Sequence, residues 1–238
     1  MSLQTAMATD PWFSSWNYGL FQILFRYLPH TKITDELCDQ LISNPLLSSW
    51  IFAACFYRYW HQGDAHTEWR RSYLFRTVLA FGLAGLVTLV VRPWVHWPAP
   101  VLNPDFQPLF PHYLWGNGSA NCFPSHSTLA YFTIAAGFWP LNRKLSVCLS
   151  IFALSFVSFP RVYAGGHYPI DVLFSCVLGL SVLAGAWHWP VAARAASGSL
   201  TLKLPSWLKD SLMFLWVFEL AEGFRASESL FRAVRHWL

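Results

Sequence analysis

Long apolar segments dominate this sequence and set the strongest limit on its fold. Five of them stand out, at residues 46–60, 78–94, 129–141, 145–159 and 170–189. A helix needs about 20 mainly apolar residues to cross a bilayer, and aromatic or small residues flank each segment and can extend it. Charged residues make up 12% of the chain, against about 25% in an average soluble domain. We therefore predict an all-α, polytopic membrane bundle with five to six transmembrane helices.

Two further segments decide how the ends of the chain are arranged. Residues 12–28 have an amphipathic pattern that fits either a sixth span or a helix lying in the membrane interface. The apolar stretch 212–220 is too short to cross, which favours an amphipathic helix on the membrane surface. We therefore expect three parts, namely an N-terminal helix and loop (1–44), a membrane core (45–190) and a cytoplasmic amphipathic tail (191–238).

The 16 Lys and Arg residues are distributed unevenly between the loops. The loops after the first and third apolar segments and the tail carry twelve of them, whereas the alternate loops carry three, Lys32, Arg92 and Arg161. Arg26, in the segment 12–28, is assigned to neither side. Because cytoplasmic loops are enriched in Lys and Arg, segments 92–124 and 160–169 are expected to face outward from a bacterial inner membrane. The basic residues form no dense patch of the kind that nucleic-acid binding requires, so membrane lipids are the expected partners.

The two outward segments hold most of the reactive side chains. The first runs from Arg92 to the sequence Cys-Phe-Pro-Ser-His-Ser at 122–127, and the second from Arg161 through His167 to Asp171. An Arg at the end of a span is costly unless it meets an anion, and its guanidinium matches phosphate oxygens. A helix that starts at Pro-Ser gathers free N–H groups for an anion. If their segment is helical, His167 and Asp171 share one face, where the carboxylate can leave the far imidazole nitrogen as nucleophile or base. The pattern indicates phosphate chemistry at the outer membrane interface.

This arrangement resembles the type 2 phosphatidic acid phosphatase superfamily. Its members carry Lys seven residues before Arg-Pro, then Pro-Ser-Gly-His, then Ser-Arg, five residues, His, three residues and Asp. The third motif fits at Arg161, His167 and Asp171, and Arg92-Pro93 fits the second half of the first. The resemblance covers residues 78–189. The N-terminal helices are compatible with bacterial members that act on polyprenyl diphosphates.

Three positions depart from that pattern. Gly85 stands where the Lys is expected, Pro160 replaces the Ser before Arg161, and the second motif reads Pro-Ser-His-Ser, which places His126 one residue early. A shift of one residue at a helix start rotates a side chain by about 100°, although an extended turn can absorb it. His126 is therefore either the general acid of the reaction or a structural residue.

The resemblance implies covalent phosphoryl transfer without a metal or a cofactor. His167 would attack phosphorus to give a phosphohistidine, Asp171 would orient it, and His126 would protonate the leaving oxygen, with His112 as the alternative proton source. The equatorial oxygens would meet four phosphate-binding side chains, Arg92, Ser125, Ser127 and Arg161. The outward loops beyond the N-terminal segment hold Asp105 and Asp171, too few carboxylates for a two-metal phosphatase.

The expected substrate is a lipid phosphate within the bilayer, with a polyprenyl diphosphate such as undecaprenyl diphosphate as the expected class. One alternative is a phosphotransferase that moves the phosphate to a lipid or sugar acceptor. Another is a catalytically weakened homologue that acts in transport or assembly, which the residues at Gly85 and His126 motivate. Cys38 and Cys122 both fall on the predicted outer side, where a disulfide between them is possible.

Overall fold

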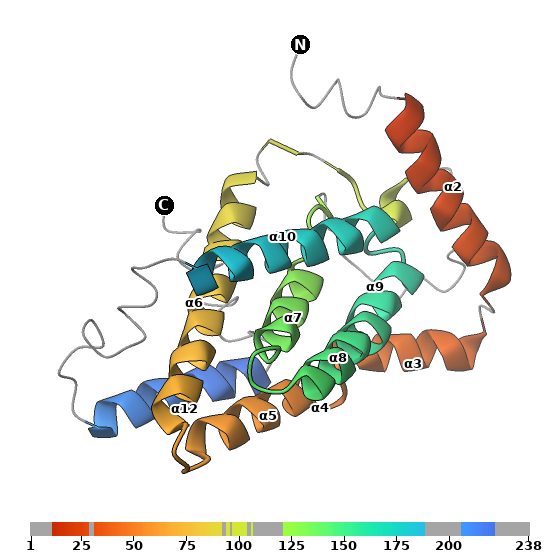
Figure 1. Cartoon of the computed structure of the whole chain (residues 1–238). Coiled ribbons are helices and arrows are strands. Elements are labelled where there is room, and N and C mark those ends of the chain that lie inside the picture. The colour runs from red at the N-terminus through yellow and green to blue at the C-terminus, as the bar shows by residue number, and fades with distance from the viewer. Residues whose placement is uncertain are drawn as a thin grey trace, which may run out of the picture.

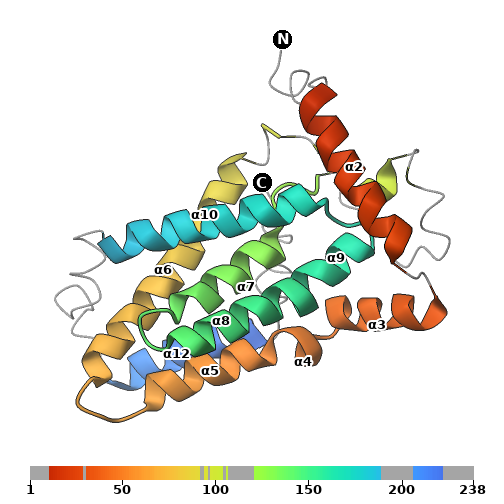
Figure 2. The same ribbon diagram turned by 45° about the vertical axis from the view of Figure 1, so that its right-hand side comes forward.

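The chain forms a bundle of helices in a computed structural model (Figure 1). The structure describes residues 11–28, 31–91, 94–95, 97–103, 106, 121–188 and 206–221. All regular secondary structure within these residues is helical, which confirms the all-α prediction. Figures 1 and 2 show that the starts of α7 and α10 and the end of α9 lie at one end of the bundle.

Three described helical segments are long and apolar enough to cross a membrane. They are α6 (Thr67–Val91), the continuous helix of α8 (Arg143–Phe152), η3 (Ala153–Ser158) and α9 (Phe159–Tyr163), and α10 (Pro169–His188). Their most apolar windows have mean hydropathies of 2.1, 1.8 and 1.9. At about 1.5 Å per residue, some 20 residues rise about 30 Å, the thickness of the hydrocarbon core. The protein is therefore an integral membrane protein, and these segments correspond to three of the predicted spans.

The other two predicted spans form helices that are shorter than a bilayer requires. α7 (His126–Gly137) covers 12 residues, and the first predicted span is divided between α4 (Pro45–Ser48) and α5 (Trp50–His61). Nine residues of α7 are buried, and the helix packs against α6, α10 and η3. Its apolar composition therefore reflects burial inside the bundle rather than contact with lipid.

A glycine allows α6 and α7 to approach each other closely. A Cβ atom at Gly137 would overlap the side chain of Thr77, whose own Cβ would lie 2.9 Å away. Thr77 is buried, and its hydroxyl donates to the carbonyl of Tyr73 at 3.0 Å. Small buried residues continue along α6 at Ala80 and Ala84. Such close packing supplies much of the attraction between helices in a membrane.

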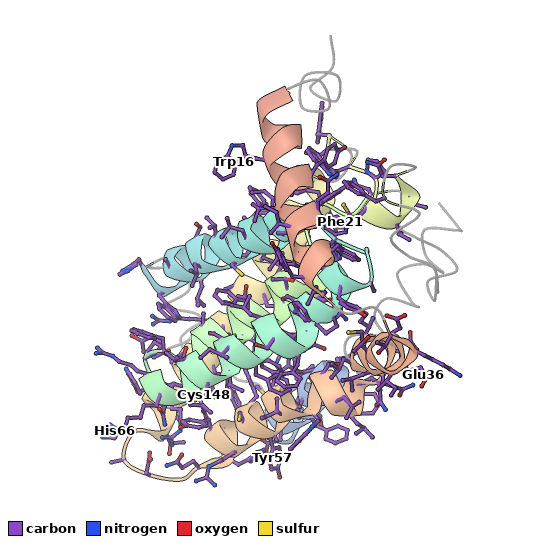
Figure 3. The ribbon with its side chains drawn as sticks, turned by 90° about the vertical axis from the view of Figure 1, so that its right-hand side faces the viewer. Trp16, Phe21, Glu36, Tyr57, His66 and Cys148 are labelled. Atoms are coloured by element: carbon purple, nitrogen blue, oxygen red, sulfur yellow. The ribbon has the colours of Figure 1, made fainter. Side chains whose placement is uncertain are left out.

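The N-terminal helix α2 (Pro11–Tyr27) carries two apolar faces. Phe21 and Phe25 are buried against the loops at the motif-bearing end of the bundle. Figure 3 shows Trp16 on a different side of the helix from Phe21, and this exposed side also carries Leu20 and Ile23. At 17 residues, α2 falls short of the candidate spans. The helix covers the loop end of the bundle.

A second N-terminal helix, α3 (Lys32–Ser43), lies where the sequence predicted a loop. Thr31 caps its start by accepting the N–H of Thr34 at 3.2 Å. The helix packs against α9, where the Tyr163 hydroxyl donates to Asp35 Oδ1 at 2.7 Å and pairs with Thr34 Oγ1 at 2.9 Å. α3 therefore anchors the end of α9, within the third motif and directly before the turn that carries His167.

The tail contributes α12 (Ser206–Ala221), which packs against α5. Met213 and Leu220 are buried in the main core, and the Ser49 hydroxyl donates to the carbonyl of Ala221 at 2.8 Å. The helix begins before the predicted apolar stretch 212–220 and is held by protein contacts, in addition to presenting apolar side chains outward. The rest of the predicted tail helix lies outside the described residues.

The turn between α5 and α6 is organised by the buried side chain of Arg70. Its guanidinium donates to the carbonyls of Tyr59 and Gln62 and to both carboxylate oxygens of Asp64, at 2.8 and 2.9 Å. These bonds satisfy carbonyls at the end of α5 that have no helical partner. The hydrogen bond from Arg70 also holds the pKa of Asp64 below its usual range. Arg70 is one of the predicted cytoplasmic cations, and its described role is structural.

Replacing Gly137 with Ala should force α6 and α7 apart, because rotation of the Thr77 side chain cannot move its Cβ away from the new methyl group. We expect a loss of about 1–3 kcal/mol of stability, measured as a lower midpoint of thermal unfolding in detergent. The matched control is Gly82→Ala, at a position in α6 where a Cβ would meet nothing within 4 Å. Equal midpoints for the two variants would contradict the packing described above.

Candidate active site

Three segments meet around the third motif. They are the loop before α7 (121–125), the turn between α9 and α10 (164–168) and a strap formed by residues 97–103. The carbonyl of Trp97 accepts the N–H of Cys122 at 2.8 Å, and the N–H of Val101 donates to the carbonyl of Gly165 at 3.0 Å. The strap therefore ties the second and third motifs together through backbone hydrogen bonds.

The turn that carries His167 depends on a glycine. Gly165 has a φ of 72°, in the left-handed region that residues with a Cβ rarely adopt. The N–H groups of Gly165 and Gly166 donate to the carbonyls of Val162 and Arg161 at 3.0 and 2.9 Å. The chain therefore folds back at the end of α9 and presents His167 directly before α10 begins.

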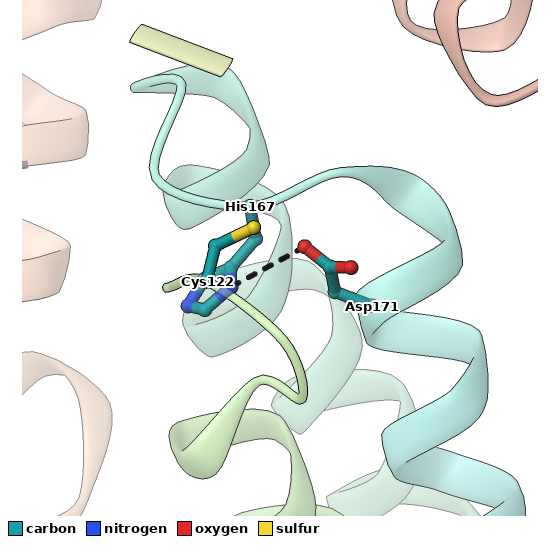
Figure 4. A group of neighbouring side chains, drawn as sticks. All are labelled: Cys122, His167 and Asp171. Atoms are coloured by element: carbon teal, nitrogen blue, oxygen red, sulfur yellow. Dashed lines mark ion pairs between the residues drawn. The ribbon is translucent and has the colours of Figure 1, made fainter. Parts of the chain in front are cut away.

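Asp171 links this turn to the start of α10. Its side chain is fully buried, and Oδ2 accepts the N–H of Tyr168 at 2.8 Å, which caps the helix. Pro169 occupies the first helical position, where a missing N–H is tolerated. The same Oδ2 lies 3.6 Å from Nδ1 of His167, whose side chain is 17% exposed (Figure 4). This separation is longer than a hydrogen bond. Because Nδ1 faces the carboxylate, Nε2 is the nitrogen that can meet a substrate.

Cys122 lies beside this pair, as Figure 4 shows. Its sulfur, a ring nitrogen of His167 and a carboxylate oxygen of Asp171 all lie within 4.8 Å of one another. The thiol is buried and donates weakly to the carbonyl of Pro98, with 3.7 Å between sulfur and oxygen. Burial and then the nearby Asp171 raise the pKa of Cys122, so the group is a neutral thiol. Cys38 and Cys122 are both free, so the disulfide considered between them is not formed.

A directed chain of hydroxyl groups fixes the start of α7. Ser125 is the N-cap residue, but its side chain does not bond the helix N–H groups. Its hydroxyl pairs with that of Thr128 at 3.0 Å, Thr128 donates to Ser158 at 2.9 Å, and Ser158 donates to the carbonyl of Ala153 at 3.1 Å. Since the Thr128 proton goes to Ser158, Ser125 must be the donor in its own pair. The cap therefore leaves the first N–H groups of α7 for an anion.

Arg161 follows a wide turn in its helix. The segment η3 is π-helical, and the N–H of Phe159 donates to the carbonyl of Leu154, five residues back. Nη1 of Arg161 donates to the carbonyl of Val157 at 2.6 Å, the one hydrogen bond of this side chain among the described residues. Its other guanidinium N–H groups therefore remain for a ligand. Such π turns are frequent at functional sites.

The remaining predicted site residues lie apart from the group formed by Cys122, His167 and Asp171, or outside the described residues. His126 and Ser127 occupy the first two positions of α7, and both are half-buried. His126 is outside the group formed by Cys122, His167 and Asp171. Gly85 lies within α6, where a Cβ would meet nothing within 4 Å. Two predicted residues, Arg92 and His112, lie outside the described residues.

Tyr168, next to His167, is enclosed by aromatic rings. It is 1% exposed, and burial raises the pKa of its phenol. The surrounding rings have centroids 5.5 to 6.3 Å from that of Tyr168, and they belong to Phe21, Tyr18, Trp97 and Phe106. Two of them come from α2, so this helix supports the His167 turn from outside. The sequence analysis missed both this contact and the position of Cys122.

Comparison with known proteins identifies the family of this chain. The family model of the PAP2 superfamily matches residues 73–195, more than half of the chain. This chain belongs to the PAP2 superfamily. It is also 27% identical over 167 residues to undecaprenyl-diphosphatase BcrC of Bacillus subtilis (strain 168), covering 70% of this chain and 80% of that protein. No solved structure matches the chain.

Membership in the PAP2 superfamily confirms the resemblance drawn from the motifs, and together with the relative it supports a lipid phosphatase. The matched region begins in α6 and ends after α10, so it contains the three segments of the site. The helices α2, α3, α5 and α12 lie outside it. Two of these, α2 and α3, nevertheless contact Tyr168 and Tyr163, which stand on either side of the Gly165 turn.

Gly165→Ala should distort the turn that carries His167, because alanine in the left-handed region costs about 1–2 kcal/mol. A displacement of the imidazole by about 1 Å is expected to slow turnover by up to about a hundredfold. Gly165→Asn is the control and should be milder, since asparagine tolerates this conformation. Phosphate release and thermal unfolding of both variants check the prediction, and a fully active alanine variant would contradict it.

Proposed function

We propose that the protein hydrolyses a polyprenyl diphosphate or related lipid phosphate through a phosphohistidine formed on His167. The observation that carries this proposal is the position of His167 Nδ1, 3.6 Å from the buried carboxylate of Asp171. A carboxylate at one ring nitrogen keeps the proton there and leaves the lone pair of the other nitrogen for attack. Catalytic hydrogen bonds are often long without substrate and shorten in the reacting complex.

The reaction proceeds in two displacements at phosphorus. Nε2 of His167 attacks, the bond from phosphorus to the leaving oxygen breaks, and His126 donates a proton to that oxygen. Asp171 stabilises the positive charge that develops on the imidazole. Water then attacks the phosphohistidine, its proton passes to His126, and free phosphate leaves with His167 restored.

The charge of the transferred phosphoryl group is met by groups from both motifs. Arg161 offers its unused guanidinium N–H groups, and the first turn of α7 offers backbone N–H groups together with the hydroxyl of Ser127. Ser125 acts by holding the helix start, because its proton is already donated within α7. Arg92 is assigned from its motif. Positioned donors of this kind are the main source of catalysis in phosphoryl transfer, so turnover is expected without a metal.

The surface beside the site suits a substrate with a long apolar chain. Directly after Asp171, α10 exposes Leu173, Phe174 and Val177. Phe123, next to the second motif, contacts Phe174 with ring centroids 4.6 Å apart. A phosphate at His167 would therefore have its chain among apolar side chains that face lipid. The relative named an undecaprenyl diphosphatase supports a diphosphate of a long polyprenol.

We place the site on the outer face of a bacterial inner membrane. The basic connections between α5 and α6 and between α7 and α8 lie together, since Asn142 donates to the hydroxyl of Tyr59 at 3.1 Å. The motifs lie at the other end of these helices (Figure 2). The enrichment of cytoplasmic loops in Lys and Arg then turns the motif end outward.

His167→Ala should abolish turnover, with a loss of about 10⁴-fold or more, because the nucleophile is removed. The wild-type protein, incubated with labelled diphosphate, should yield a phosphoenzyme that is labile in acid and stable in base, and the variant should yield none. His188→Ala, at the far end of α10, is the matched control and should retain activity. The measurement is release of free phosphate by purified protein from lipid monophosphates and diphosphates.

Retained turnover in His167→Ala would remove the covalent mechanism. Phosphate found on an added lipid or sugar acceptor, instead of in water, would identify a transferase. The same assay in right-side-out vesicles should proceed with a short-chain diphosphate added outside. Turnover confined to inverted vesicles would overturn the proposed orientation.

His126→Ala tests the altered second motif. If His126 is the general acid, hydrolysis of a lipid monophosphate should slow by about 10²–10⁴-fold, because its alkoxide leaving group needs a proton. A diphosphate releases a weaker base and should slow less. Equal losses on both substrates, with a lower unfolding midpoint than that of Ser127→Ala, would instead assign His126 a structural role. If His126→Ala is unaffected on both substrates, another group must supply the proton to the leaving oxygen.

A further inference from the structure

Cys122, His167 and Asp171 bring a sulfur, a nitrogen and an oxygen ligand to one point. Their ligand atoms lie within 4.8 Å of one another, and within the described parts of the chain no other group of three His, Cys, Asp or Glu side chains does this. The three come from the loop before α7, the turn before α10 and the first turn of α10 (Figure 4). The proposed hydrolysis uses two of them and gives Cys122 no task.

The spacing of these atoms suits a shared metal better than a hydrogen bond. Nδ1 of His167 is buried without a hydrogen-bond partner, and it lies 3.6 Å from Oδ2 of Asp171. Two ligand atoms that bind one tetrahedral zinc at about 2.0–2.2 Å lie about 3.3–3.6 Å apart. Because all three ligand atoms lie within 4.8 Å of one another, a shift of the Cys122 sulfur by about 1 Å would complete the set. Its contact with Pro98 is weak at 3.7 Å.

We propose that Cys122, His167 and Asp171 form an inhibitory binding site for Zn²⁺ that overlaps the nucleophile. The binding itself follows from the ligand geometry, whereas the inhibition rests on the proposed function of His167. Thiolate, imidazole and carboxylate are the usual zinc ligands, and three protein ligands leave a fourth position for water. Mg²⁺ and Ca²⁺ prefer oxygen ligands and are not expected to bind.

Metal binding blocks the attacking nitrogen through the imidazole tautomer. When zinc occupies Nδ1, the ring proton resides on Nε2, and the lone pair that attacks phosphorus is lost. Zinc also forms a bond to the Cys122 sulfur, and the thiol proton is released to the buffer. The two positive charges of the metal are then balanced by one thiolate and one carboxylate, so the buried site holds no net charge.

Cobalt binding tests the site without any substrate. Metal-free, full-length protein in detergent should bind one Co²⁺ and develop a thiolate-to-cobalt charge-transfer band. The band should persist in Cys148→Ala, which removes an exposed cysteine of α8, and should disappear in the near-isosteric Cys122→Ser. Cys122→Ala gives a second reading if the serine variant unfolds. A band that survives both Cys122 substitutions, or no band in the wild-type protein, overturns the site.

Inhibition is measured separately as phosphate release across a zinc titration, each variant being compared with its own rate in chelator. The half-inhibiting zinc concentration should rise at least about tenfold in Cys122→Ser, the lower end of the effect of lost supporting groups at metal sites. It should stay unchanged in Cys148→Ala, and Mg²⁺ should have no effect. A cobalt band without turnover on any lipid phosphate would refute the proposed function and keep the metal site. If turnover depends on His167 but is not slowed by zinc, the proposed inhibition is refuted and the proposed function is kept.

Discussion

A buried carboxylate at the start of α10 is the group on which the rest of the site depends. An ionised carboxylate in the interior costs several kcal/mol unless polar partners compensate. Asp171 receives the N–H of Tyr168, lies in the first turn of a helix whose dipole favours negative charge there, and faces His167. One group therefore caps a membrane helix and orients the imidazole. We therefore expect a substitution at this position to change both the stability of the start of α10 and the placement of His167.

The surroundings of Asp171 come from distant parts of the chain. The strap of residues 97–103 forms backbone hydrogen bonds with the loops of both motifs, and α2 places aromatic rings around Tyr168. In α3, Asp35 accepts a hydrogen bond from the hydroxyl of Tyr163. Helices α2 and α3 lie outside the region that the family model of the PAP2 superfamily matches. The region that the family model matches is thus supported by helices outside it, and contacts from those helices hold residues close to His167.

Local patterns in the sequence predicted part of this arrangement. Hydropathy located α6 and α10, and the four-residue spacing of His167 and Asp171 indicated that the two side chains lie close together. His167 itself lies in the turn before α10 and not on a face of that helix. The same hydropathy made α7 resemble a span, since an apolar helix reads alike whether lipid or protein surrounds it. The position of Cys122 could not be predicted, because it depends on backbone bonds between the strap and two loops. The role of α3 depends similarly on a tertiary contact with Tyr163.

The π-helical segment η3 acts as a one-residue insertion within a spanning helix. A π turn holds one residue more than an α turn, so Arg161 is rotated by about 100° from its place in an uninterrupted helix. A relative without this turn presents its arginine on the same side only when its helix is one residue shorter between Ala153 and Ser158. If such a relative is aligned with this chain without a gap between Ala153 and Ser158, positions that face lipid in one protein are compared with positions that face the site in the other. Evolutionary divergence read from such an alignment is therefore overstated for this helix.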